Sequence, residues 1–527
     1  MKMTTVKATE WTYPDRFEYR SGADRADIFG ARSSYAEIQL VFSGVPEGAS
    51  VSAKASGAIA AFDVEWYELV PVFVEANANL PENDESRDEW IPSRAAPYWL
   101  YDCVKPLGAH LTPKDGGAAL YAALKIPQDA VPGLYEGTYD ITVAGETFAV
   151  PVTLTVYAAR IPEAEHLKII NGYSRAPILQ FHNVESGTPA FHALDEKYLR
   201  LLRRMRQNML YVGGVRQTGP DESGHYQFDF SALKQDVEFF RSLGYKYFNM
   251  SSVGGRRSWS ESTILVAGYP SMSYEAYCYL ADYLPALQAF LDEQGWTDCF
   301  YMGVSDEPND ANATEFRALC GLIRKLAPRI RLIDALSYTA VHGALDVWVP
   351  LNASYEEHRA EFESFRHGDD EIWHYVCCGP RDKKYINRFM DYPLLSTEYL
   401  FWGNYKYNLA GYLHWASNCY QPGQNPFLQN CPEHRNADAV CILPPGDTHI
   451  LYPGDGEPWM SMQLEAHRRS AEDYELLRML AEHDKARADE ICAKGFRSFR
   501  DVEYDPNRFE AIRRELLAAC SALTANA

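Results

Sequence analysis

Two acidic residues, Asp306 and Glu307, come directly after an apolar run in the segment CFYMGVSDEPND (299–310). The run is typical of a buried β-strand, and Pro308 ends it. Carboxyl groups this close repel each other when both are ionised, so one of them is expected to keep its proton near neutral pH. Pro308 is also expected to keep Glu307 extended. The pair could combine an acid for a leaving group with a charge that stabilises a cation.

Adjacency narrows the chemistry that these two carboxyl groups could perform. An ordinary glycosidase places an acid and a base or nucleophile about 5–9 Å apart, on opposite sides of the scissile bond. Neighbours on one strand cannot easily straddle a sugar ring. They suit a substrate whose own 2-acetamido group attacks the anomeric carbon and forms an oxazolinium ion. In this hypothesis Glu307 is the general acid/base and Asp306 stabilises the acetamide, and the two titrate as a coupled pair.

The elements that position this pair are predicted from hydrophobic periodicity. Apolar strands alternate with amphipathic helices from residue 166 onward, which predicts a (β/α)8 TIM-type barrel. A doubly wound open sheet is the second interpretation, because periodicity cannot show closure, but no Gly-rich nucleotide fingerprint follows any strand. The eight strand segments are 166–173, 208–215, 245–253, 299–308, 329–336, 346–353, 371–380 and 409–418. Helices are expected over 194–207, 228–244, 274–295, 313–328 and 354–366 and from near Met460.

The chain before this alternating region has a different pattern. Residues 17–157 contain short segments rich in β-branched and aromatic residues, bounded by Gly, Pro and Asp, which predicts an antiparallel β-sandwich. Residues 160–166 are expected to be a linker. We therefore expect a β-sandwich domain over 1–158, a catalytic barrel over 159–486 and a C-terminal helical extension over 487–527.

In such a barrel, functional residues lie at the C-terminal ends of the strands. Carboxylates, amides and aromatic rings gather there, which is typical of a sugar site and not of a metal site. Filling of the barrel wall is the alternative for Trp373 and His414. Cys431, His434 and Cys441 match no zinc spacing, and neither a metal nor a cofactor is expected. The candidate substrate-binding residues are Asn171, Tyr173, Asp334, Tyr338, Trp373, Tyr375, His414, Trp415 and Asn418.

Composition limits the partners. The formal net charge of −22 argues against nucleic acids and anionic membranes, so a neutral small glycan or glycoconjugate is expected. No signal peptide or transmembrane stretch is recognised, and the 11 cysteines form no regular framework. A cytoplasmic protein with free thiols is therefore the expectation. The sequence does not predict the oligomeric state.

Several segments carry a family resemblance. GWTDCFYMGVSDEP (295–308), LAGYLHWASNCY (409–420), the segment 451–480 with its EDYELL motif, and 119–143 resemble glycoside hydrolase family 123 and its DUF4091 relatives. The resemblance implies a β-sandwich followed by a (β/α)8 barrel. It also implies a retaining β-N-acetylgalactosaminidase that uses Asp306 and Glu307 in substrate-assisted catalysis. Gln463 and Ser470 depart from the family pattern, in which Arg and Gly are usual.

The sequence thus predicts an exo-glycosidase that releases a terminal β-linked 2-acetamido sugar, with N-acetylgalactosamine as the first choice. One alternative is plain two-carboxylate hydrolysis of a neutral hexoside, with Asp334 as the distant partner. Another is a carbohydrate-binding protein without catalysis. The sugar, the aglycone and the role of the sandwich are left open.

Overall fold

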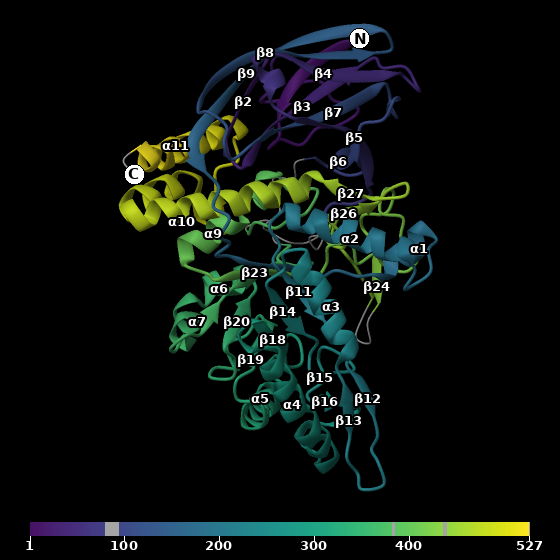
Figure 1. Cartoon of the computed structure of the whole chain (residues 1–527), viewed down its shortest axis with the longest axis vertical. Helices are drawn as coiled ribbons and strands as arrows, with labels where there is room; N and C mark the ends of the chain where they lie inside the picture. The colour runs from purple at the N-terminus through teal and green to yellow at the C-terminus, as the bar shows by residue number, and fades with distance from the viewer. Residues whose placement is uncertain (79–93, 382–384, 436–439, 526–527) are drawn as a thin grey trace.

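A computed structural model describes residues 1–78, 94–381, 385–435 and 440–525 of the chain. It is a multidomain protein of mixed β and α/β structure, with several sheets (Figure 1). The N-terminal strands lie at one end of the long axis and the parallel strands toward the other. Two long C-terminal helices lie between them.

Two sheets make up the N-terminal region, and their facing side chains form a shared apolar core that includes Leu40, Leu120, Tyr139 and Leu154. The first sheet has the order β1 (Lys2–Lys7), β3 (Ser34–Ser43), β7 (Gly117–Ile126), β5 (Val64–Val74), β6 (Tyr98–Pro106), β27 (Pro458–Ser461) and β26 (Leu451–Pro453). The second has the order β2 (Ala26–Arg32), β9 (Glu146–Arg160), β8 (Gly133–Val143) and β4 (Val51–Gly57).

The prediction of a purely antiparallel sandwich is wrong at one pair of strands. β2 runs parallel to β9, with Ala26 opposite Val152. These strands are separated by more than a hundred residues of sequence, so no tight hairpin forces them to be antiparallel. β27 also pairs with β6, so a segment near the C-terminus extends the first sheet. The domain boundaries at 158 and 486 stay predictions.

Each of the eight predicted strand segments contains a parallel strand. The larger parallel sheet consists of six strands, from β11 to β21, which are paired in chain order. In a second parallel sheet, β23 lies between β10 and β22. The strands are β10 (Lys168–Asn171), β11 (Met209–Val212), β14 (Tyr247–Met250), β18 (Phe300–Gly303), β19 (Arg331–Leu336), β20 (Val347–Pro350), β21 (Glu371–Ile372), β22 (His374–Tyr375) and β23 (Gly411–His414).

Helices connect most of these strands. The helix predicted over 354–366 is two helices, because the backbone leaves helical geometry at His358 (ψ 28°). The connecting helices are α2 (Pro189–Arg204), α3 (Ser231–Ser242), α4 (Tyr274–Gln294), α5 (Ala313–Leu326), α6 (Asn352–Glu357), α7 (Arg359–Phe365), α8 (Leu395–Glu398) and α9 (Leu400–Tyr407).

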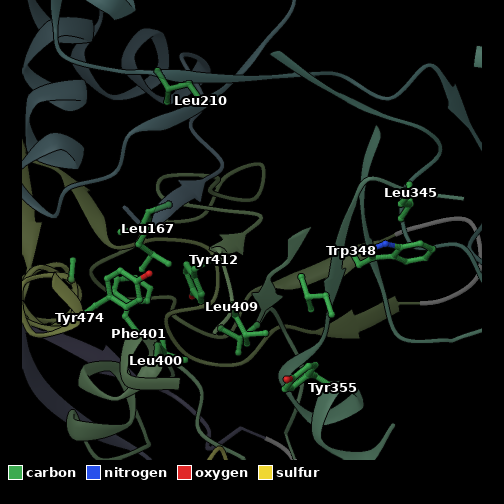
Figure 2. Packing of buried hydrophobic residues seen from close by; sticks show 14 of the residues in the cluster. Leu167, Leu210, Leu345, Trp348, Tyr355, Leu400, Phe401, Leu409, Tyr412 and Tyr474 are labelled. Carbon is green, nitrogen blue, oxygen red and sulfur yellow. The ribbon is translucent and has the colours of Figure 1, made fainter. Parts of the chain in front are cut away.

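Apolar side chains pack on both faces of the parallel strands. One face carries a cluster that includes Tyr301, Ile333, Val349 and Trp373. The other face packs against the helices, in the larger cluster to which the side chains of Figure 2 belong. Each such buried side chain stabilises the fold by about 1.5–3 kcal/mol. The strands are therefore held rigidly enough to position the loops that follow them.

The long helix α10 (Met462–Gly495) connects the two regions, followed by α11 (Pro506–Ala525). Arg468 and Arg469 of α10 are buried, and both form ion pairs with Glu37 of β3. Arg469 also pairs with Glu398 of α8 at 2.5 Å. Buried charges need such partners. Among the described residues, no helix combines the length and the apolar character that crossing a membrane requires.

Candidate active site

A cavity of about 680 Å³ lies beyond the C-terminal ends of the parallel strands. It is lined by residues of β11, β14, β18, β19, β22 and β23 and by residues of the loops after β14, β18, β22 and β23. Its acidic lining residues are Asp306, Glu307, Asp334 and Asp447, and its aromatic ones are Tyr211, Trp259, Tyr375 and Trp415. Carboxylates and aromatic rings around one concave surface can bind a sugar and protonate its leaving group.

The loop after β18 has an unusual backbone. Asp306 has φ 60° and Glu307 has φ 38°, in the left-handed region that residues other than Gly rarely occupy. The expectation that Pro308 keeps Glu307 extended is therefore wrong. Such conformations cost about 1–3 kcal/mol each and persist only where the surroundings enforce them. This turn presents two neighbouring carboxyl groups to one cavity.

Two side chains enforce this turn. Oδ2 of Asp334, on β19, accepts hydrogen bonds from the backbone N–H groups of residues 304, 305 and 306, at 3.3, 3.0 and 3.2 Å. Arg256 donates from Nη2 to the carbonyl oxygens of Asp306 (2.5 Å) and Glu307 (2.9 Å). A residue before a proline prefers an extended backbone, and this local preference of Glu307 is the basis of the sequence prediction. The contacts of Asp334 and Arg256 outweigh it.

A tyrosine orients the second acid. The hydroxyl of Tyr375, from β22, donates a hydrogen bond of 2.6 Å to Oε1 of Glu307. The hydroxyl of Ser337 lies 3.4 Å from that of Tyr375. A hydrogen bond to one carboxyl oxygen fixes the rotamer and leaves the other oxygen for a substrate proton.

Burial changes the acidity of the carboxyls at the turn. Asp306 is exposed to the cavity, but the protein around it limits its hydration, which raises its pKa to about 6; the charge of Glu307 adds to this shift and Arg256 opposes it. The pKa of Asp334 is raised to about 8 by burial and by the charge of Asp306, against the three backbone hydrogen bonds. Near neutral pH, Asp306 is therefore mostly ionised and Asp334 mostly protonated.

Another part of the cavity wall is built around Trp415, which follows β23. Its Nε1 lies 3.2 Å from both carboxyl oxygens of Asp447. Nδ1 of His414 accepts from the backbone N–H of Ala416, and its Nε2 lies 3.3 Å from Asp447 Oδ1. Burial lowers the pKa of His414 well below its usual value, so its ring is neutral. These contacts hold the indole of Trp415 as a half-buried wall of the cavity.

Five of the predicted site residues line the cavity, namely Asp306, Glu307, Asp334, Tyr375 and Trp415. Tyr338 lies against the ring of Trp259, which lines the cavity, with ring centroids 6.1 Å apart.

The other predicted residues are not among the lining residues, and their polar atoms contact protein groups. Asn171 binds Gln207 and Arg388, the Tyr173 hydroxyl donates to Asp195, and Trp373 Nε1 donates to Glu371. Asn418 binds the backbone of Ser174, and the ring of His414 stacks on that of Trp415 with centroids 6.2 Å apart.

Sequence reasoning did not single out several lining residues. Asn249 and Tyr211 lie on β14 and β11, so strand counting could have found them. Arg256, Trp259 and Asp447 lie in loops, where neither periodicity nor spacing carries a signal. Oδ1 of Asn249 is buried and has no hydrogen-bond partner among the residues that the structure describes.

The sequence of this chain matches a known protein family. The family described as "Glycoside hydrolase 123, catalytic domain" matches residues 165–480, more than half of the chain. The protein is a glycoside hydrolase. It belongs to glycoside hydrolase family 123. No curated protein matches the sequence.

Among solved structures, a family 123 glycoside hydrolase from Clostridium perfringens, described in a study of glycolipid glycan hydrolysis, is similar over the whole length. Its TM-score is 0.73 at 13% identity, and the alignment covers 100% of this chain and 98% of that one. A family 39 glycoside hydrolase from Bacteroides cellulosilyticus WH2 gives 0.36 at 10% identity, covering 82% and 81%. A putative β-galactosidase from Bacteroides fragilis gives 0.33 at 11%, covering 83% and 58%. At these identities, only the first likeness is informative, and it concerns the fold.

Proposed function

We propose that this protein is a retaining exo-glycosidase that releases a terminal β-linked N-acetylgalactosamine by substrate-assisted catalysis. The observation that carries the proposal is the turn that brings Asp306 and Glu307 to one cavity as neighbours. Neighbouring acids cannot act from opposite faces of one sugar ring, whereas an acetamide nucleophile needs one acid and one adjacent charge.

In the first step, the acetamide oxygen of the bound sugar attacks its own anomeric carbon. The bond from that carbon to the leaving oxygen breaks, and the Glu307 carboxyl gives its proton to the leaving oxygen. The oxazolinium ion that forms carries a positive charge. The Asp306 carboxylate balances this charge and accepts a hydrogen bond from the acetamide N–H.

In the second step, the Glu307 carboxylate takes a proton from water, and the water oxygen attacks the anomeric carbon. The carbon–oxygen bond of the five-membered ring breaks and the acetamide is restored. Two inversions leave the sugar with its original configuration. Tyr375 holds Glu307 in the rotamer that both proton transfers use.

The position of Asp334 favours this mechanism over two-carboxylate hydrolysis. Its Oδ2 accepts three backbone hydrogen bonds from the turn itself, so it lies beneath Asp306. A nucleophile or base has to face the acid across the sugar, at about 5–9 Å. Asp334 instead acts as a support for the acids, which leaves the acetamide as the nucleophile.

The site also suggests how the sugar is bound. Trp415 offers an aromatic face to the apolar side of a pyranose. Buried polar atoms without a partner are costly, so Asn249 Oδ1 is available to a hydroxyl or amide of the substrate. We further propose that the parallel strands of the eight segments, with β21 and β22 both in the seventh, form a closed (β/α)8 barrel, which the pairing of β10 with β23 supports. The similar family 123 structure is described in a study of glycolipid glycan hydrolysis, so we propose a glycan such as that of a glycolipid as the substrate class.

A release assay over matched aryl glycosides tests the proposal. The panel contains the 2-acetamido β-galactoside, the 2-acetamido β-glucoside and the two corresponding plain hexosides. The proposal predicts release from the first, and rates at least about a hundredfold lower for both plain hexosides, which lack the nucleophile. Equal rates on the plain hexosides would support the two-carboxylate alternative, and binding without release would support a carbohydrate-binding protein.

A further inference from the structure

The rim of the cavity on the side of Arg256 carries groups that the proposed reaction does not use. Trp259 lines the cavity and its side chain is 44% exposed. Tyr338, which follows β19, lies against it and is 37% exposed. Exposed rings of this size on a cavity wall are suited to stacking on a sugar. Trp415, by contrast, is half-buried.

Trp259 is held at a fixed place relative to the catalytic turn. Its carbonyl oxygen accepts hydrogen bonds from Arg256 Nη1 (2.7 Å) and from Asn309 Nδ2 (2.8 Å). The same Arg256 side chain binds the carbonyl oxygens of Asp306 and Glu307. One guanidinium therefore connects the rim loop to the acid that protonates the leaving group, which makes this rim part of the site's geometry.

A cation lies beside this platform. Arg257 also lines the cavity, and within the described part of the chain its guanidinium has no hydrogen-bond or ion-pair partner; only its backbone N–H is engaged, by Glu261. Arg257 is exposed at the cavity, so its guanidinium is accessible to a ligand there. Its five donors match a carboxylate or a sulfate.

We propose that Trp259, Tyr338 and Arg257 form a subsite for the second sugar of the substrate, and that this sugar carries an anionic group. The inference rests on the proposed function, in which the terminal sugar lies on the buried side near Trp415. An exo-acting site must let the rest of the glycan leave toward solvent, and the exposed platform lies at that exit. A cavity of about 680 Å³ is within the range of about 300–1,000 Å³ for drug-sized ligands, so it has room beyond one ring.

The test uses four glycosides of the same terminal 2-acetamido sugar. One is the methyl glycoside, one is a neutral disaccharide with a hexose as second sugar, and two are anionic disaccharides with a hexuronic acid or a sulfated hexose. The two anionic substrates distinguish a carboxylate from a sulfate. Each enzyme variant is described by a ratio of kcat/KM values, which does not depend on the fraction of folded protein.

Trp259→Ala is expected to lower the ratio of the neutral disaccharide to the methyl glycoside about three- to tenfold, while Trp259→Phe keeps most of it. Tyr274→Ala, at an exposed aromatic of α4 that does not line the cavity, is the matched control. Arg257→Gln is expected to lower the ratio of an anionic to the neutral disaccharide about threefold. Arg317→Gln, at an exposed arginine of α5, is its control.

Ratios that change less than twofold in both Trp259→Ala and Arg257→Gln would overturn the subsite. A change in the first alone would retain the platform and overturn the anionic group. If the wild-type protein does not hydrolyse the four glycosides, calorimetric dissociation constants give the corresponding ratios of affinity. The subsite is therefore tested even if the wild-type protein hydrolyses none of them, an outcome that would overturn only the proposed function.

Discussion

Oδ2 of Asp334 accepts a hydrogen bond of 3.2 Å from the backbone N–H of Asp306, so a carboxyl on one strand holds the turn that follows the neighbouring strand. The same oxygen binds the two preceding N–H groups. The buried carboxyl of Asp334 thus maintains the positive φ values of Asp306 and Glu307. The geometry of the acids depends on this support as much as on the acids themselves.

Substitution of Asp334 tests that support. Asp334→Ala removes the acceptor of three buried N–H groups, each worth about 1 kcal/mol, so the free energy of unfolding should fall by about 2–3 kcal/mol and turnover should drop with it. Asp334→Asn keeps an acceptor oxygen and resembles the protonated acid, so it should retain most of the stability. Chemical denaturation of both variants measures the difference, and equal losses would mean that the hydrogen bonds do not hold the turn.

The same residue has a pH signature. Its pKa is about 8 in the folded protein and about 3.9 in an unfolded chain, so the folded state binds the extra proton between these values. Its contribution to stability is complete below about pH 4 and is lost as pH rises toward about 8. In Asp334→Asn, the decrease in the free energy of unfolding that Asp334 causes between about pH 4 and about pH 8 should disappear. A wild-type and a variant stability curve with the same slope between pH 5 and 8 would contradict the assignment.

The acids themselves give the largest expected effect on rate. Asp306→Asn and Glu307→Gln should each lower turnover at least about a hundredfold, because one removes the stabilising charge and the other the proton donor. Both replacements are nearly isosteric, so melting temperatures should stay close to the wild-type value. Asp310→Asn, at an exposed acid three residues further on, is the matched control. Wild-type turnover in both variants would show that the chemistry lies elsewhere.

The ionisation of Asp306 should appear in the pH dependence of activity. The pKa of Asp306 is about 6 and the mechanism needs its carboxylate, so kcat/KM should fall as pH decreases through about 6. The positive charge of Arg256 lowers the pKa of Asp306, so in Arg256→Gln the fall of kcat/KM should occur at higher pH. If kcat/KM of Arg256→Gln falls at the same pH as that of the wild-type enzyme, this fall does not report the ionisation of Asp306.

Tyr375 is expected to act through Glu307. Tyr375→Phe removes the hydrogen bond of 2.6 Å to Glu307 Oε1, and hydrogen bonds to charged groups are worth about 1.5–3 kcal/mol. A fall in kcat of at least about tenfold is predicted, with little change in KM because the hydroxyl orients the acid and does not hold the sugar. Steady-state kinetics separates the two parameters, and a rise in KM with unchanged kcat would make Tyr375 a binding residue.

The strands could be predicted from the sequence because buried parallel strands are short apolar runs with clear limits. All eight predicted segments contain one, and Asp306 and Glu307 follow the fourth as expected. The parallel pairing of β2 with β9 could not be predicted, since strand direction depends on partners far away in sequence.

The site was only partly predictable, for a similar reason. A residue at a strand end can face the cavity or the packed interior, and a shift of one position decides which. Tyr375 lines the cavity, whereas Trp373, two residues earlier, is packed in the core. Arg256, Trp259 and Asp447 come from loops whose approach to the turn is fixed by tertiary contacts alone.

The participation of the substrate's acetamide is the central claim, and a series of fluorinated acetamides tests it most directly. Aryl 2-acetamido β-galactosides with zero, one, two or three fluorine atoms on the acetyl methyl group differ mainly in the nucleophilicity of the amide oxygen. The mechanism predicts that kcat falls steeply with each fluorine, because the attacking oxygen becomes a weaker nucleophile. Equal kcat values across the series would contradict it.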